Sequence, residues 1–321
     1  MPDDFQHPEV VTFGEAMGLL VTDPPRPLRS ARTFARSICG AEVNVAVGLS
    51  RLGHRAGWFG RVGDDPFGLS VLDALRSEGV DVSRAVVDSS AATGLLVRDS
   101  HPERRVSVHY WRHESAASNL NPADVDTGYL ASARLLHMTG ITPALSPACH
   151  AAVLAAAEAA RSAGVPVSFD PNLRLKLWSA PQAAEVLGPL SGYADVVLAG
   201  DTEARRLSGQ QERERAAAWF LEQGARLVVV KLGSSGVWAT DGTRQWQVPA
   251  YRVTAVDAVG AGDAFAAGYL ARWLEGADVA DCLKYATVVA AMAVQVVGDI
   301  EALPYRSEVD AALAGGDDVD R

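Results

Sequence analysis

A glycine-rich segment near the C-terminus carries the residues that are best suited to chemistry. It reads Asp257-Ala-Val-Gly-Ala-Gly-Asp-Ala-Phe-Ala-Ala-Gly268, and a helical pattern of apolar residues follows it. Gly260 and Gly262 permit a tight turn and a close approach to the backbone. The free N–H groups of Ala261, Gly262 and Asp263 would then lie at a helix N-terminus, which is a natural anion site.

Asp263 would lie inside this concavity, which we call the anion turn (residues 260–263). Its carboxylate could accept a proton from an attacking hydroxyl while the amides hold the charge of a transferring phosphoryl group. The alternative is a glycine turn whose aspartate only complements the helix dipole. No Gly-Lys-Ser/Thr follows, so the segment is not a P-loop, and Phe265 replaces the third glycine of a dinucleotide fingerprint.

The rest of the chain predicts an α/β fold with a mainly parallel sheet, because short apolar runs alternate with longer helical patterns. The expected helices each end just before a glycine, the usual left-handed cap. The expected buried strands are Val10–Phe13, Gly57–Val62, Arg134–Thr139, Val165–Phe169, Asp195–Ala199 and Arg226–Val230. The expected helices are Glu42–Leu52, Pro66–Ser77 and Ser146–Ser162.

Two segments interrupt this alternation and predict a small β layer over the site. Residues 93–99 and 105–111 have strand character and are joined by a turn-rich stretch, which indicates an antiparallel hairpin. A second insertion at about 15–38 carries two short extended patches. We therefore expect one catalytic domain over residues 1–321, with a lid formed by insertions at about 15–38 and 92–112.

Composition excludes several classes of protein. The 321 residues carry a formal net charge of -10, which argues against a broad surface for nucleic acid or an anionic membrane. The three cysteines are far apart, so neither a disulfide framework nor a thiolate zinc site is indicated. The acidic, polar first residues do not resemble a signal peptide, and no apolar stretch is long enough to span a bilayer. We expect a cytoplasmic protein.

Two separated motifs resemble the signatures of the ribokinase-like (PfkB) sugar kinases. The segment 257–268 is similar to the C-terminal signature, and Gly40-Ala-Glu-Val-Asn-Val-Ala to the N-terminal one. The order of strands, helices and insertions is similar from Val10 to Pro304. The resemblance implies a three-layer α/β/α fold with a β-sheet lid and transfer of the ATP γ-phosphoryl group to a sugar hydroxyl. Asp263 would be the base, and the amides of Gly260, Ala261, Gly262 and Asp263 the anion hole.

The resemblance also implies where the nucleotide and its metal would bind. Lys231-Leu-Gly-Ser-Ser-Gly236 is similar to the family's nucleotide-binding turn, with Lys231, Gly233, Gly236 and Gly262 as contacts; a plain hairpin turn is the alternative. Glu203 stands where the family has a Mg²⁺-linked glutamate, acting through water. Gly200 replaces the asparagine of that motif, Ala258 a threonine or serine, and Cys39 a glycine. A monovalent cation near the anion turn is left open.

Two arginines in the sequence indicate which class of sugar the protein would bind. Arg112 follows the predicted hairpin, and Arg174 follows a buried strand in Asp170-Pro-Asn-Leu-Arg. A guanidinium suits a carboxylate, although each arginine could instead be an ordinary surface or ion-paired residue. Together with the motifs, they resemble the 2-keto-3-deoxygluconate kinase branch of the family. The expected substrate contacts are Gly40, Asn44, Tyr110, Arg112 and Arg174.

Other functions stay open at this point. The first is a kinase of a neutral sugar such as fructose or ribose, or of a nucleoside. The second is a protein that binds sugar or nucleotide without catalysis, and a nicotinamide-dependent dehydrogenase is more remote because no glycine-rich fingerprint follows the first strand. The exposed edges of the lid suggest a homo-oligomer, a dimer formed through the lid.

Overall fold

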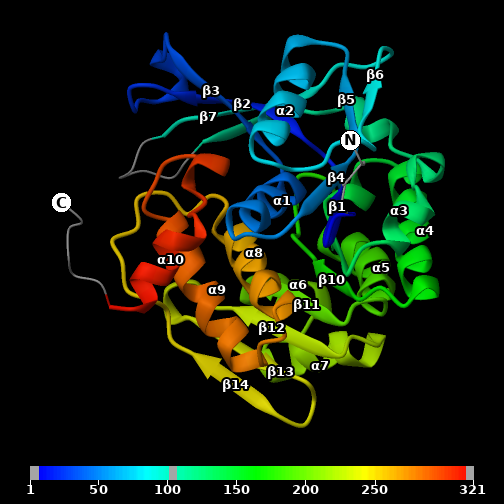
Figure 1. Cartoon of the computed structure of the whole chain (residues 1–321), viewed down its shortest axis with the longest axis vertical. Coiled ribbons are helices and arrows are strands. Elements are labelled where there is room, and N and C mark those ends of the chain that lie inside the picture. The colour runs from blue at the N-terminus through cyan, green and yellow to red at the C-terminus, as the bar shows by residue number, and fades with distance from the viewer. Residues whose placement is uncertain (1–6, 101–106, 316–321) are drawn as a thin grey trace, which may run out of the picture.

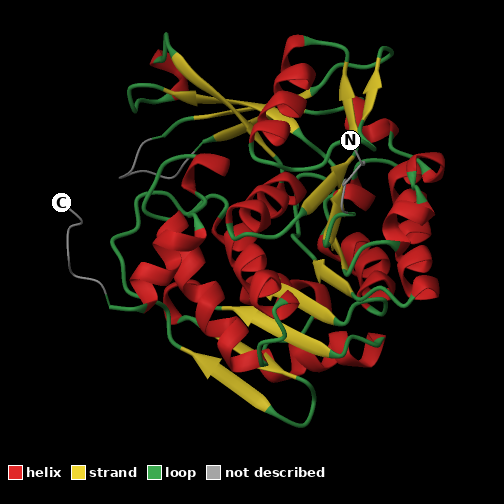
Figure 2. Ribbon diagram, viewed as in Figure 1, coloured by secondary structure: helices red, strands yellow, loops and turns green. Residues whose placement is uncertain are grey.

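An eight-stranded sheet forms the centre of the molecule (Figure 2). The computed structural model describes residues 7–100 and 107–315. The strand order is β14-β13-β12-β11-β10-β9-β1-β4, and the six strands from β12 to β4 run parallel. The strands are β1 (Val10–Phe13), β4 (Ala56–Phe59), β9 (Leu135–Thr139), β10 (Val167–Asp170), β11 (Val196–Gly200), β12 (Leu227–Lys231), β13 (Val237–Thr240) and β14 (Gln245–Val248).

Helices cover both faces of this sheet, so the molecule has three layers (Figure 1). Successive residues of one strand face opposite layers: Val228 packs in one apolar cluster and Val229 in the other. One layer holds α1 (Ala41–Arg51), α2 (Pro66–Ser77), α8 (Ala261–Leu274), α9 (Val279–Ala293) and α10 (Arg306–Leu313). The other holds α3 (Thr127–Ala131), α4 (Pro147–Ala163), α5 (Ala180–Ser191), α6 (Asp201–Ser208) and α7 (Arg213–Gln223).

A second, four-stranded sheet lies at one end of the molecule, and we call it the lid sheet (Figure 1). Its order is β3-β2-β7-β8, built from β2 (Met17–Thr22), β3 (Phe34–Cys39), β7 (Gly94–Arg98) and β8 (Val108–Trp111). β7 and β8 pair antiparallel, which confirms the predicted hairpin. The turn predicted between them falls at 101–106, outside the described residues.

The sequence predicted most of the other elements to within a few residues. The α/β class, the mainly parallel sheet and the three predicted helices are confirmed, and Gly53, Gly79 and Gly164 cap those helices with positive φ angles of 93°, 75° and 70°. The single strand predicted at Gly57–Val62 was wrong. The chain leaves the central sheet at Gly60, and β5 (Arg61–Gly63) pairs instead with β6 (Val86–Asp88) in a separate two-stranded sheet.

The antiparallel edge of the central sheet was not predicted. β12 turns directly into β13, and β13 pairs with β14, so this edge of the sheet reverses direction. The alternation of β14, with two exposed and two half-buried residues, is typical of a strand at a sheet edge. Among the described helices, none is long and apolar enough to cross a membrane.

Candidate active site

The anion turn lies at the start of α8, as the glycine spacing predicted. Gly260 precedes the helix with a φ of +77°, a left-handed conformation that glycine adopts without strain. Ala261, Gly262 and Asp263 form the first turn of α8, so their N–H groups have no partner earlier in the helix, although the N–H of Ala261 makes a long, 3.4 Å contact to the carbonyl oxygen of Ala258. Only 8% of Asp263 is exposed, and burial raises the pKa of its carboxyl to about 7.

Asn44 joins the two sequence motifs at this point. It lies on α1 with 2% of its surface exposed, and its Nδ2 donates a hydrogen bond to Asp263 Oδ2 over 2.8 Å. Gly40 starts the same helix, and a Cβ there would lie 2.3 Å from the carbonyl oxygen of Glu15. The packing of α1 against α8 thus brings residues 219 positions apart into one hydrogen bond.

Lys231 brings a positive charge to the same place. It ends β12, and its Nζ lies 2.6 Å from Asp170 Oδ2 at the end of β10. A Cβ built on Gly262 would lie 3.4 Å from this Nζ, so the ammonium group is close to the anion turn. Burial alone would lower the pKa of Lys231, but the carboxylates of Asp170 and Glu203 outweigh it and raise the pKa.

A cavity of about 450 Å³ opens beside Lys231, between the start of α6 and the turn after β12. Lys231, Gly233 and Glu203 line it, together with Gly200, Asp201, Thr202, Arg213, Leu232 and Ser235. Gly236, a predicted nucleotide contact, does not line it. A Cβ on Gly236 would lie 2.1 Å from the carbonyl oxygen of Val248, so this glycine permits the close crossing of the chain near β14.

The residues around the cavity fit a hydrated Mg²⁺ rather than a caged one. Both carboxylate oxygens of Glu203 accept backbone N–H groups, from Leu173 over 2.9 Å and from Gly200 over 2.8 Å. No group of three or more His, Cys, Asp or Glu side chains within the described part of the chain could hold a metal ion. Mg²⁺ commonly keeps several waters and binds through one carboxylate and substrate phosphates, which matches a single glutamate at this position.

The lid sheet contributes a buried ion pair. Arg112, just after β8, pairs with Glu15, and its Nε lies 3.2 Å from Glu15 Oε1. Glu15 is 2% exposed, and burial raises its pKa to about 7. The Arg112 guanidinium also lies 5.3 Å from the centre of the Tyr110 ring. Cys39, close to this pair, is buried, and burial raises the pKa of its thiol far above the usual value.

Arg174 has a different environment from Arg112. It follows β10 and is exposed, and the described residues include no ion-pair partner for it. Its charge nevertheless reaches the site, because it lowers the pKa values of Asp263 and Tyr110 against the raising effect of burial. The two predicted arginines therefore differ in state: Arg112 is anchored by a carboxylate, and Arg174 has no ion-pair partner among the described residues.

No role was predicted from the sequence for three acidic residues of the site, Glu15, Glu42 and Asp170. Glu15 anchors Arg112, and Asp170 binds Lys231. Glu42 is fully buried and accepts hydrogen bonds from Thr139 over 2.6 Å and from Thr142 over 2.7 Å. The sequence did carry a signal: each acid lies just after a buried strand, at its end, or at the start of a helix. A buried carboxylate at such a place needs a hydrogen-bond or ion-pair partner.

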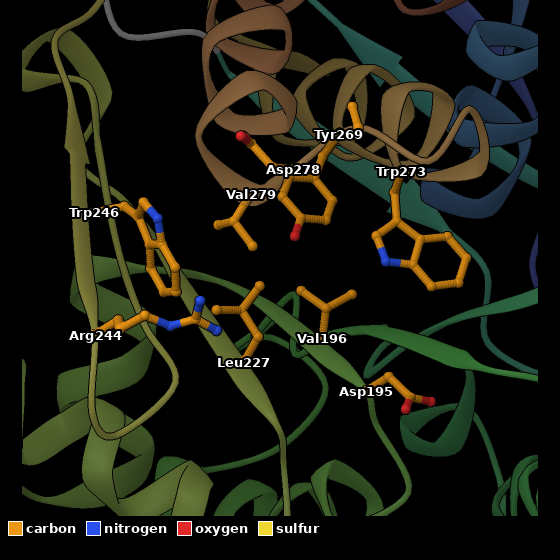
Figure 3. Close-up of a pocket in the computed structure, with 10 residues that line it drawn as sticks. Asp195, Val196, Leu227, Arg244, Trp246, Tyr269, Trp273, Asp278 and Val279 are labelled. Carbon is orange, nitrogen blue, oxygen red and sulfur yellow. The ribbon is translucent and has the colours of Figure 1, made fainter.

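A second hollow, of about 410 Å³, lies at the opposite end of the strands (Figure 3). Asp195, just before β11, and Leu227, the first residue of β12, line it beside Trp246, Tyr269 and Trp273. None of the predicted site residues reaches it. Ligands of open α/β sheets bind outside the carboxyl ends of the strands, so we assign the site to the end that carries the anion turn.

Comparison with known proteins identifies the class of this molecule. Residues 7–306 match the pfkB family carbohydrate kinase. The chain is 38% identical over 310 residues to a 2-dehydro-3-deoxygluconokinase from Bacillus subtilis, covering 95% of both chains. It is 35% identical to a protein of the same description from Thermoproteus tenax, covering 95% of this chain and 94% of the other. The chain belongs to the pfkB family and is a sugar kinase.

Solved structures agree in fold. A PfkB protein from Polaromonas sp. JS666 has a TM-score of 0.87 at 40% identity, covering 95% of this chain and 99% of that one. A Ribokinase II from E. coli, in complex with ATP and Mg²⁺, has a TM-score of 0.89 at 27% identity, covering 96% and 100%. A fructokinase from Vibrio cholerae, with fructose, ADP and potassium ion bound, has a TM-score of 0.84 at 31% identity, covering 95% and 98%. These neighbours support nucleotide and metal use in the family.

The raised pKa of Asp263 predicts the pH dependence of turnover. If Asp263 is the base of the reaction, it works only when deprotonated, so kcat/KM should rise with pH through about 7 and then level off. The hydrogen bond from Asn44 favours the charged carboxylate, so Asn44→Ala should move this rising limb to higher pH. The measurement is kcat/KM between pH 5.5 and 9 for both proteins.

A matched control is Asn119→Ala. Asn119 also donates to a carboxylate, Asp88, over 3.0 Å, but this pair does not belong to the site. Loss of the hydrogen bond from Asn119 should leave the rising limb of kcat/KM at the same pH. A limb that stays at the same pH in Asn44→Ala would show that another group titrates.

Proposed function

We propose that this sugar kinase phosphorylates a sugar acid, 2-keto-3-deoxygluconate, with ATP as donor. The observation that carries the proposal is the buried Asp263 at the N-terminus of α8, in a chain similar to two 2-dehydro-3-deoxygluconokinases. The carboxylate has a pKa of about 7, which suits a general base near neutral pH. The reacting hydroxyl is the terminal one.

In the proposed step, Asp263 removes the proton of the sugar hydroxyl as its oxygen attacks the γ-phosphorus. The bond from this phosphorus to the β,γ-bridging oxygen breaks, and ADP leaves with the electron pair. The N–H groups of Gly260, Ala261, Gly262 and Asp263 stabilise the charge that develops on the phosphoryl oxygens. The Lys231 ammonium, close to Gly262, adds positive charge at the same place.

ATP would occupy the cavity lined by Lys231, Gly233 and Glu203, and Gly262, which lies close to the Lys231 ammonium, would contact its phosphates. Gly236 would support the shape of this turn without touching the nucleotide. Mg²⁺, when bound, supplies charge neutralisation of the phosphates, and Glu203 would hold one of its waters. Because the proposed donor is ATP, the proposal includes a cytoplasmic location.

The sugar acid would bind between the anion turn and the lid sheet. Arg174, which is exposed and without an ion-pair partner among the described residues, would bind the substrate carboxylate. Arg112, oriented by Glu15, would add a second donor beside Tyr110. Gly40 and Asn44 would contact the sugar from α1. The chain would act as one catalytic domain, with the lid sheet covering the bound sugar.

One observation favours a second candidate, a kinase of a neutral sugar such as fructose or ribose, or of a nucleoside. Arg112 already has a carboxylate partner in Glu15, so of these two arginines Arg174 alone has no ion-pair partner among the described residues. The fructokinase from Vibrio cholerae is also similar over most of this chain. A protein that binds sugar without catalysis remains the third candidate, and the retained Asp263 argues against it.

Release of ADP across a panel of sugars separates these candidates. We expect 2-keto-3-deoxygluconate to give a kcat/KM at least about tenfold above fructose and ribose, a difference of the size of one charged contact. Asp263→Asn should lower kcat by about 10² or more while ATP still binds. Asp73→Asn, an exposed aspartate on α2, is the matched control and should be unchanged. Faster turnover of fructose would favour the second candidate, and ATP binding without turnover of any sugar would favour the third.

Arg174→Ala tests recognition of the acid group. Losing a charge-assisted contact should raise KM for the sugar acid by about 10- to 100-fold and leave KM for fructose nearly unchanged. Arg206→Ala removes an exposed arginine on α6 and should change neither value. An unchanged KM for the sugar acid in Arg174→Ala would remove the sugar-acid assignment.

The proposal includes a homodimer formed through the lid sheet. Its edge strands β3 and β8 carry the exposed apolar residues Phe34 (39%) and Trp111 (61%), and unpaired edges of this kind tend to be covered. Light scattering should give the mass of two chains for the wild type and of one chain for Phe34→Glu. Leu69→Glu changes an exposed leucine on α2 (49%) and should stay dimeric. A monomeric wild type would exclude the dimer.

A further inference from the structure

Arg98 forms a buried ion cluster beside the anion turn that the proposed reaction does not use. It is the last residue of β7 in the lid sheet, and only 1% of it is exposed. Its Nη1 lies 2.7 Å from Asp257 Oδ2, and its Nη2 lies 3.8 Å from Asp299 Oδ1. Both carboxylates are buried as well, at 7% and 6% exposure. A buried guanidinium between two buried carboxylates requires a reason, since ions are costly to desolvate.

Asp257 connects this guanidinium to the anion turn. One of its carboxylate oxygens, Oδ2, faces Arg98, and the other, Oδ1, accepts the N–H of Val259 over 3.1 Å. The N–H groups of Val256 and Asp257 donate to the carbonyl oxygen of Val294, over 2.7 and 3.0 Å. Val259 immediately precedes Gly260, so the Asp257 carboxylate is hydrogen-bonded to the residue just before the anion turn.

Asp299 holds the guanidinium from the other side. It lies in the loop after α9, and burial raises its pKa to about 6 while the charge of Arg98 opposes that rise. Arg98 therefore links three parts of the fold: the lid sheet that carries it, the segment before the anion turn, and the loop after α9. No other arginine or lysine in the described residues pairs with Asp257 or Asp299.

We propose that Arg98 is a positioning residue for phosphoryl transfer: its guanidinium is the fixed cation that orients Asp257 and the anion turn. The sequence left open a monovalent cation near this turn. The Asp257 carboxylate, however, already has the guanidinium on one oxygen and a backbone amide on the other, and the fixed positive charge of Arg98, 2.7 Å from Oδ2, disfavours a second cation there. The enzyme thus works without a free monovalent ion. This inference rests on the proposed kinase function.

The wild-type enzyme gives the first test. Turnover and melting temperature are measured in equal concentrations of potassium, sodium and tetramethylammonium chloride, the last being too large to enter a buried site. We expect kcat to agree within about twofold and the melting temperature to be the same in the three salts. A tenfold or greater stimulation by potassium would overturn the inference. An enzyme that phosphorylates no sugar in any salt would instead contradict the proposed function.

The second test removes the guanidinium. Arg98→Ala should lower kcat at least about tenfold, with KM for the sugar changed by less than about threefold, because Arg98 acts on the turn and not on the sugar. Low millimolar guanidinium or methylguanidinium should restore part of kcat, and Arg98→Lys should retain more activity than Arg98→Ala. An unchanged kcat, or a loss that neither guanidinium ion restores, would overturn the positioning role.

Arg61→Ala is the matched control for this rescue. Arg61 also bridges two carboxylates, Asp88 over 3.2 Å and Asp124 over 2.8 Å, but these lie outside the site. Added guanidinium should not raise the kcat of this variant. Rescue of both variants alike would show a general effect of the ion and would overturn the inference. If Arg98→Ala does not fold, the comparison of salts with the wild type decides by itself.

Discussion

The burial of a single carboxyl group at the start of α8 is the constraint on which the site depends. Water is nearly excluded from Asp263, so the pKa of its carboxyl rises to about 7. A free N-terminal turn would favour the charged form, as does the hydrogen bond from Asn44. The balance leaves a group that can be deprotonated near neutral pH and still attract a proton strongly. Close packing of α1 against α8 maintains this balance.

Several cationic side chains lie around that carboxyl group, although the protein as a whole is acidic. The chain has a net charge of -10, yet Lys231 and Arg174 both lie close enough to lower the pKa of Asp263. The buried ones are matched with acids: Lys231 with Asp170, Arg112 with Glu15, and Arg98 with Asp257. Buried charges are tolerated only when paired, so these acids determine where positive charge can be held. Arg174 is exposed and needs no such partner, which leaves its charge for a ligand.

How far the fold could be predicted depended on how local the signal was. Helices such as Pro66–Ser77 have their period, cap and terminating glycine within one segment, and they were predicted to within a residue or two. The run from Gly57 to Val62 reads as one strand, but a Cβ on Gly60 would lie 2.3 Å from the carbonyl oxygen of Gly14. That contact comes from a segment over 40 residues away, so no local pattern could indicate that the strand divides there. The reversed edge at β13 and β14 was missed for a similar reason, since pairing direction depends on the partner.

By itself, the sequence determined the anion turn, the class of fold and the family, because glycine spacing and apolar period act over a few residues and the motifs are contiguous. The tertiary structure determined which polar and charged side chains pair with one another. It alone joined Asn44 to Asp263, gave Arg112 a partner in Glu15, and brought Arg98 from the lid sheet to Asp257. Electrostatic pairing depends on distances of a few ångströms between segments far apart in the chain, and only folding sets those distances.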